Sequence, residues 1–415
     1  MRNLVLLTAI TFILFMSRGI TGPIGSLYAE SLGASYVAIG LLGTVTSLSA
    51  ILFSTVWGRA SDRLGRRKVF LVPSLAVTAV AYGLMAGVPR YEYLFPLHAL
   101  GAIAQAAYNV ASLALMGDLL EGRAGERGRR MGTYRGLGSL GFGLMAFVSG
   151  SIADRLSLRV PFGLAGSFLA VACLLALWIK DPAPARNRVL PNNPVSTDTY
   201  ADPAHRLPLA PLLISAFLWS LSIGAVYAVW ANYMVSGLGY SQTALGRLWA
   251  LASMSELPFM MLAGRLSDRI GRLPMLGLGF LTWSLVFAGY VVAPGMPWIV
   301  LIQLVRGFAY SAYVATAMTY ATEVRSRSQR GLASGLYGSA EGAGSILGSS
   351  MGGALAQFTG FQAMIGTNAV LVFGGAVYLA GAAVRWARRG GVGGRENTTD
   401  REIHDGTDWG VGISD

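Results

Sequence analysis

Four ionisable residues lie deep inside long apolar stretches of this sequence: Arg18, Glu256, Arg306 and Glu341. If those stretches cross a lipid bilayer, a charge at the bilayer centre costs about 2.5 to 3.5 kcal/mol on insertion scales unless it is paired or faces water. Burial favours the neutral form of a carboxyl group and a nearby arginine favours the charged form, so an acid in this setting can bind and release a proton. We therefore predict that these residues lie on a pathway for protons or solute, with Glu256 as the proton carrier.

Polar and aromatic side chains with helical spacing accompany these charges. Residues three or four positions apart lie on one side of a helix. The residues with this spacing are Gln303, Arg306, Tyr310 and Tyr313 in one stretch, Gln105, Tyr108 and Asn109 in a second, and Tyr227 and Trp230 in a third. Two such faces at corresponding places in two halves of a protein can line one central cavity, and we predict that they do.

Both features have a purely structural alternative. A permanent pair between Glu256 or Glu341 and Arg18 or Arg306 would fix helix packing and move no proton. Aromatic stripes at helical spacing are also common in packed cores. The sequence leaves these alternatives open.

The composition indicates the solvent that surrounds the elements carrying these residues. The chain is 53% hydrophobic and only 13% charged, with a mean hydropathy of +0.53, which is too apolar for an ordinary soluble protein. Its apolar runs are about 20 residues long, as membrane-spanning helices require, whereas barrel strands would give alternating segments of about 10 residues. We predict an all-α integral membrane protein.

Twelve apolar spans can be counted along the chain. The loops after even-numbered spans, together with Lys180 at the end of the sixth span, hold 19 Lys and Arg, against three in the loops after odd-numbered spans. Because positive residues stay on the cytoplasmic side, we expect both termini to be cytoplasmic in a multi-pass protein of the cell (inner or plasma) membrane. The spans are 4–28, 36–57, 69–88, 93–117, 132–152, 161–180, 209–235, 243–263, 274–293, 296–321, 331–356 and 361–385.

The sequence contains an internal repeat. GRASDRLGRR at 58–67 recurs as GRLSDRIGRL at 264–273, an offset of 206 residues, and residues 126–141 match residues 329–344 at an offset of 203. Six spans precede the polar, proline-rich stretch at 181–206 and six follow it. One six-helix unit is therefore duplicated, in parallel orientation because six is an even number. We predict four segments, namely an N-terminal bundle at 1–180, a cytoplasmic linker at 181–208, a C-terminal bundle at 209–385 and a disordered cytoplasmic tail at 386–415.

The repeated decapeptide, G-x-x-x-D-R-x-G-R-R between spans two and three with a degenerate copy between spans eight and nine, resembles the major facilitator superfamily. The resemblance covers residues 1 to about 385 and implies twelve transmembrane helices in two pseudo-symmetric six-helix bundles. In that family the loop acid belongs to a cytoplasmic charge network that latches the two halves in the outward-facing state. The resemblance implies a gate motif made of Gly58, Asp62, Arg63, Gly65, Arg66 and Arg67 in the first copy and Gly264, Asp268, Arg269, Gly271 and Arg272 in the second.

Physical reasoning supports a role for the acid of this motif. A carboxylate in the loop can bind a nearby helix N-terminus, where free N–H groups and the helix dipole favour negative charge. Leu273 and Pro274 replace Arg67 and Lys68 in the second copy, so we expect its latch to be weaker. The alternative is that the arginines only enforce orientation, which leaves the repeated acid unexplained.

Several function classes are excluded. No Lys follows a Gly, so the chain has no phosphate-binding loop of an ATPase. The lone Cys173 and three scattered histidines predict no metal site, cofactor or enzyme activity. The basic residues are not interleaved with aromatics on one face, so the net charge of +12 predicts no nucleic-acid partner.

We predict a monomeric secondary active transporter that moves a small organic solute by alternating access and is coupled to protons, as a drug or metabolite exporter or a symporter. The alternatives are a passive channel or uniporter and a transport-dead sensor or scaffold. Leu100 stands where the repeat partner has Arg306, and span five lacks the proline-containing signature of proton-driven drug exporters. SELPFM at 255–260 looks like the importing branch, so the direction of transport stays open.

Overall fold

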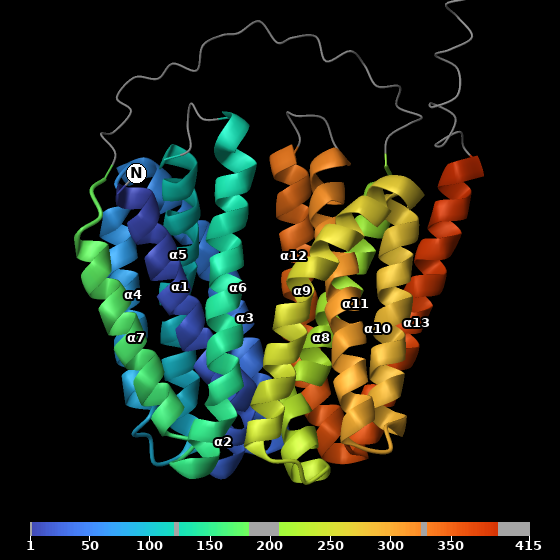
Figure 1. Ribbon diagram of the computed structural model, residues 1–415, viewed down its shortest axis with the longest axis horizontal. Helices are drawn as coiled ribbons and strands as arrows, with labels where there is room; N and C mark the ends of the chain where they lie inside the picture. The colour runs from blue at the N-terminus through green and yellow to red at the C-terminus, as the bar shows by residue number, and fades with distance from the viewer. Residues whose placement is uncertain (1, 120–123, 182–206, 325–329, 389–415) are drawn as a thin grey trace, which may run out of the picture.

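The computed structural model describes residues 2–119, 124–181, 207–324 and 330–388. Within these residues the regular elements are helices (Figure 1). The predicted linker and tail lie almost wholly outside the described residues.

The N-terminal bundle begins with a broken helix, because Gly22 and Pro23 interrupt the first span with a 3₁₀ turn before it continues. Its elements are α1 (Arg2–Thr21), η1 (Gly22–Ile24), α2 (Gly25–Ser31), α3 (Tyr36–Leu64), α4 (Lys68–Met85), η2 (Tyr91–Tyr93), α5 (Leu94–Leu119), α6 (Ala124–Arg155) and α7 (Val160–Leu177). The elements of the C-terminal bundle are α8 (Leu209–Asn232), η4 (Tyr233–Gly237), α9 (Gln242–Ile270), α10 (Arg272–Val292), α11 (Met296–Glu323), α12 (Arg330–Thr359) and α13 (Phe361–Trp386). Since α1, η1 and α2 form one span, the helices match the twelve predicted spans.

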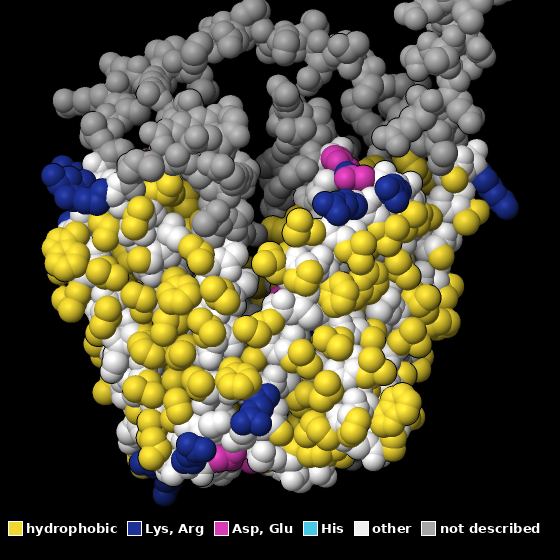
Figure 2. Space-filling model, viewed as in Figure 1, with side chains coloured by type: hydrophobic (Ala, Val, Ile, Leu, Met, Phe, Trp, Pro, Cys, Tyr) yellow, Lys and Arg dark blue, Asp and Glu magenta, His cyan; other side chains and the backbone are white. Residues whose placement is uncertain are grey.

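Ten of the described helices are long and apolar enough to span a membrane. The two long helices outside this set are α9, which carries Arg247 and Glu256, and α12, which is rich in Gly and Ser. Figure 1 shows both running beside the other helices through the molecule. Figure 2 shows hydrophobic side chains covering the middle of the visible face, while charged side chains gather toward its two ends. The all-α membrane fold is confirmed.

The two bundles contact each other chiefly through α3 against α12 and α6 against α9. These contacts centre on a glycine seam at the end of the molecule opposite the repeated decapeptides. A Cβ atom added to any seam glycine would overlap the backbone of the facing helix. The clashing pairs are Gly40 with Ser349, Gly246 with Ala146, Gly150 with Gln242, and Gly353 with Tyr36.

The glycine seam follows the internal repeat. Gly40 and Gly246 are 206 residues apart, and Gly150 and Gly353 are 203 residues apart, the same two offsets that relate the repeated motifs. The pseudo-symmetry therefore extends from the sequence to the surface where the bundles meet. Glycine at these positions lets two helix backbones approach more closely than any side chain would allow.

Candidate functional site

Arg306 lies in the interior of the C-terminal bundle, where it is only 6% exposed. Its guanidinium stands 4.8 Å from the ring centroid of Tyr227 on α8 and 4.6 Å from that of Trp249 on α9. One turn earlier on α11, the amide oxygen of Gln303 accepts a hydrogen bond from Arg306 Nη1 at 3.2 Å. A desolvated cation–π contact stabilises a buried cation by about 2 kcal/mol. The two ring faces together therefore offset much of the desolvation cost of the Arg306 guanidinium, as a carboxylate partner would.

Glu256 lies half-buried on α9, seven residues beyond Trp249 and on the same side of the helix. It interacts with Arg306 through their charges, yet among the described residues the two form no ion pair within 4.0 Å. Ser311 Oγ donates to the Glu256 backbone carbonyl at 3.0 Å and so ties α11 to α9 beside the acid. Among the described residues, the permanent pair considered from the sequence is therefore not formed.

An aromatic cluster from α8 to α11 surrounds Arg306. Trp219 stacks on Tyr313 at 3.9 Å and lies 6.4 Å from Tyr310, while Trp230 lies 5.8 Å from Trp249. Trp230 and Tyr313 are 0% exposed and pack against the neighbouring rings. The members of the aromatic cluster are Trp219, Tyr227, Trp230, Trp249, Trp283, Tyr290, Tyr310 and Tyr313.

Five nitrogen atoms in and beside this cluster have no direct hydrogen-bond partner among the described residues. They are Trp230 Nε1, Trp249 Nε1, Trp283 Nε1, Gln303 Nε2 and Arg306 Nε. A buried donor left unpaired costs about 1 to 3 kcal/mol. Such donors are therefore expected to find acceptors in another state of the protein, from water or from a bound solute.

The predicted polar face of the N-terminal bundle divides between two environments. Tyr108 is 3% exposed and shares a hydrogen bond of 2.8 Å with Thr11 Oγ1 of α1. Gln105 Nε2 donates to Asn109 Oδ1 at 3.2 Å, and Asn109 is exposed. Arg18 lies 5.3 Å from the ring centroid of Phe15. Arg18 therefore makes a cation–π contact with one ring, whereas Arg306 in the other bundle makes such contacts with two.

Glu341 lies apart from the Arg306 cluster. Tyr337 OH donates to Glu341 Oε1 at 2.7 Å, and the hydroxyl oxygens of Tyr337 and Tyr313 are 3.5 Å apart. The next residue along α12, Gly342, abuts Ile51 of α3 in the other bundle. The acid therefore stands where α12 meets the N-terminal bundle and is linked through hydroxyl groups to the edge of the aromatic cluster.

The first decapeptide is organised by Arg67. Its Nη1 donates to Ser61 O at 2.9 Å and to Asp62 Oδ1 at 3.3 Å, and its Nε donates to Asp118 Oδ2 at 3.3 Å. In the second copy Arg272 Nη1 donates to Asp268 Oδ1 at 2.7 Å. Arg272 also bonds Glu323 through Nε at 2.9 Å and Nη2 at 2.8 Å.

These contacts change the correspondence predicted from the sequence, where Arg66 aligns with Arg272. Arg67 takes the position of Arg272, because α10 begins directly after Gly271 whereas two further residues separate Gly65 from the start of α4 at Lys68. The second network also has the shorter distances. Leu273 is 1% exposed and packs α10 into the core rather than standing in for a lost arginine.

Alanine substitutions test the assignment of Arg67. Arg66 is exposed, whereas the Arg67 side chain is 14% exposed and bridges the ends of α3 and α5. We expect Arg67→Ala to lower the free energy of unfolding by about 1 kcal/mol and Arg66→Ala to change it by less than about 0.5 kcal/mol. Thermal unfolding of the purified protein in one detergent measures both, and equal losses would contradict the assignment.

Two helical bundles with an apolar belt, ionisable groups inside the membrane and a repeated seam define a multi-pass membrane transport protein. The sequence profile of the MFS_1 like family matches residues 4–365. The chain belongs to this family, so the predicted membership of the major facilitator superfamily is confirmed. Because the family and the relatives below are transporters of small solutes, this protein is a membrane transporter and not an enzyme.

The chain is also similar to two relatives in sequence and to one solved structure in fold. A putative sugar efflux transporter of Deinococcus radiodurans is 27% identical over 366 residues, 86% of this chain and 92% of that protein. The maltose permease of Geobacillus stearothermophilus is 26% identical over 329 residues, 79% of this chain and 80% of that protein. A bacterial homolog to the human lysosomal transporter Spinster, inward-facing and unoccupied, has a TM-score of 0.77 at 16% identity and covers 93% of this chain and 97% of that chain. The last likeness concerns the fold alone.

Proposed function

We propose that this protein is a secondary active transporter that moves a small organic solute by alternating access, with protons as the coupling ion. The observation that carries the proposal is the arrangement of Glu256 and Arg306, two opposite charges at mid-membrane that interact without forming a fixed pair. A unit charge gains about 2.3 kcal/mol per 100 mV of membrane potential. That energy is enough to drive a cycle whose states differ by a few kcal/mol.

The coupling follows from competition for Arg306. An ionised Glu256 attracts the guanidinium, whereas a protonated Glu256 leaves it held by Tyr227, Trp249 and Gln303 alone. Its unpaired Nε is then available to an acceptor group on the solute. Binding of a proton to the acid and binding of solute beside the arginine therefore favour each other in one state of the cycle.

We propose that the structure represents the inward-facing state. The glycine seam closes the end opposite the decapeptides, and Figure 2 shows the visible face hollowed between the bundles toward the decapeptide end. Asp62 has 78% of its side chain exposed, and among the described residues its ion pair is with Arg67 of its own bundle. With the arginine-rich decapeptides in the cytoplasm, both termini are cytoplasmic as well.

The closed seam favours a transporter over a passive channel. A channel needs one continuous pore, whereas backbone contact at Gly150 and Gly353 blocks the path at one end. Alternating access requires that one end be closed while the other is open.

The proposal is tested with purified protein in lipid vesicles. A thermal-shift screen first identifies a solute that stabilises the protein. Sugars head the library, because the relatives include a sugar efflux transporter and a maltose permease. Counterflow exchange and accumulation under an imposed pH gradient are then measured. Exchange without pH-driven accumulation would refute proton coupling, and a flux that shows no counterflow would indicate a channel.

Asp62→Asn tests the gate motif. The acid is exposed and, within the described part of the chain, its partner is Arg67 at 3.3 Å, so its neutralisation is expected to change the free energy of unfolding by less than about 1 kcal/mol. If Asp62 bonds the opposite bundle in the outward-facing state, the variant shifts the population toward the inward-facing state. Labelling of engineered cysteines at the seam measures this shift, and an unchanged labelling rate would remove Asp62 from the gate.

A further inference from the structure

We propose that Asp154 and Glu30 form an outer latch, a pair of gate residues in the N-terminal bundle that hold the seam closed by binding neutral donors of the C-terminal bundle. This inference rests on the proposed alternating-access cycle, and it adds the residues that govern access at the end opposite the decapeptides.

Asp154 lies in the last turn of α6 and binds the first turn of α9. Its Oδ2 accepts from Thr243 N at 2.8 Å and from Thr243 Oγ1 at 2.6 Å. A second N–H of that turn, at Ala244, already donates to the capping side chain of Ser241 at 3.1 Å. The carboxylate thus satisfies a helix N–H that has no partner inside the helix, and its charge complements the positive end of the helix dipole.

The repeat builds a similar contact a second time, one residue earlier in the helix, since Tyr36 corresponds to Gln242 and not to Thr243 at the offset of 206 residues. Ser35 caps α3 as Ser241 caps α9, at the offset of 206 residues. Tyr36 N, at the start of α3, donates to Gln357 Oε1 at 3.0 Å, and Gln357 stands 203 residues after Asp154. One copy of the latch therefore carries a charge and the other a neutral amide. Charge-assisted hydrogen bonds are about twice as strong as neutral ones, so the contact between α6 and α9 is the stronger of the two.

Glu30 supplies a carboxylate on the side of the seam where the amide of Gln357 binds the start of α3. Its Oε2 accepts from Asn232 Nδ2 at 2.7 Å and from Ser236 Oγ at 2.9 Å, both in the other bundle. Its Oε1 accepts from Tyr36 OH at 2.9 Å, which places the acid against the start of α3. Each side of the seam thus has one carboxylate from the N-terminal bundle facing donors of the C-terminal bundle.

The choice of neutral donors suits a contact that must break in every cycle. Among the described residues, the ion pairs between acidic and basic side chains involve Arg67 and Arg272 at the decapeptide end, and none joins the bundles at the seam. Asp154 is exposed, so water can replace Thr243 as its partner when the seam opens. A carboxylate held by N–H and hydroxyl groups is released without stranding a partner cation.

A buried seam residue reports the state of the outer latch. Ser149 is 0% exposed and packs beside Gly246. We would introduce Ser149→Cys after replacing the single native cysteine by Cys173→Ser and measure maleimide labelling of the full-length protein in lipid vesicles. Labelling requires opening of the seam and needs no solute.

Asp154→Asn and Glu30→Gln are each expected to raise the labelling rate about tenfold, equivalent to about 1.4 kcal/mol. Thr243→Val, which removes one donor and leaves the acid in place, is expected to raise it by a smaller factor. Gln357→Glu adds the missing charge at the symmetric position and is expected to lower the rate. Asp62→Asn, which acts at the other end, should also lower it.

An unchanged rate in both acid variants, with thermal stability like that of the parent, would overturn the outer latch, and so would a rate that Gln357→Glu raises. These outcomes are separate from a failure of the proposed function. If Glu256 carries no coupled proton, driven transport fails its own test while the labelling rates still respond to Asp154 and Glu30.

Discussion

Glu256→Gln is expected to abolish solute accumulation driven by a pH gradient while solute exchange remains measurable. The amide keeps the size of the side chain and much of its hydrogen-bonding capacity, but it neither binds nor releases a proton. Arg306 keeps its contacts with Tyr227 and Trp249 in the variant, because those contacts do not involve the acid. Solute flux in vesicles with and without a pH gradient separates the two activities.

Glu341→Gln is the matched control for this prediction. Glu341 is also a half-buried acid inside a span, but it accepts a hydrogen bond from the Tyr337 hydroxyl at 2.7 Å and does not belong to the Arg306 cluster. We expect the control to retain pH-driven accumulation. Driven accumulation that survives in Glu256→Gln would remove Glu256 from the coupling mechanism, and its loss in Glu341→Gln alone would move the coupling site to α12.

Gly150→Val is expected to reduce transport by about a hundredfold by preventing the seam from closing. A Cβ at this position overlaps the backbone of Gln242 on the facing helix, and overpacking a close contact costs about 1 to 3 kcal/mol. The same substitution does not disturb the N-terminal bundle itself, so the protein is expected to fold and to rest with its outer end open. Labelling of Ser349→Cys in the seam, faster than in the parent, would show the open state.

Gly374→Val provides the control. Gly374 lies on α13, it is exposed, and an added Cβ there meets no atom within 4 Å. Transport close to the parent rate is expected for this variant. If Gly150→Val transports at that rate too, closure of the glycine seam is not required for the cycle.

The hydropathy of the sequence was sufficient to predict the fold, because bilayer thickness fixes the length of an apolar span. Hydropathy gave the weakest evidence of a membrane span for α9 and α12. Their charged and small residues lower the hydropathy of helices that pack against the other bundle. The internal repeat agrees with the count of twelve spans, since six spans in one half match six in the other.

The contacts of the candidate site were harder to predict. Helical spacing placed Gln303 and Arg306 on one face, but it could not show that Trp249, from another helix, would cover the guanidinium. Helical spacing on α8 placed Tyr227 and Trp230 on one face, and of these two Tyr227 contacts the guanidinium. The eleven-residue step from Trp219 to Trp230 was a signal that could have added a third ring to that face.

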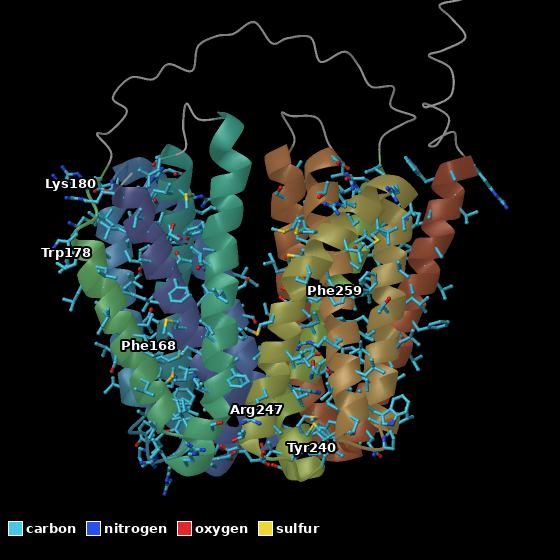
Figure 3. All side chains as sticks on the ribbon, in the orientation of Figure 1. Phe168, Trp178, Lys180, Tyr240, Arg247 and Phe259 are labelled. Atoms are coloured by element: carbon cyan, nitrogen blue, oxygen red, sulfur yellow. The ribbon has the colours of Figure 1, made fainter. Side chains whose placement is uncertain are left out.

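Loop geometry was the other limit. Alignment of the decapeptides assigned Arg66 to the role that Arg67 fills, because the shift arises from the start of α4 and not from the motif itself. Contacts between the bundles, such as Asp154 with Thr243 or Arg247 over the ring of Phe147 at 5.5 Å, join residues about a hundred positions apart with no shared pattern. Figure 3 shows Arg247 on α9, where this helix runs beside α6. Sequence spacing carries no information on such pairs.

The seam between the bundles is a fit of main chain against main chain, and this has a consequence for how such a protein can change over time. Atoms of the peptide backbone are the same whatever residues stand nearby. Side chains one or two turns away, including those that would contact the solute, can therefore be substituted without preventing closure. A seam of this kind can be retained while the solute specificity changes.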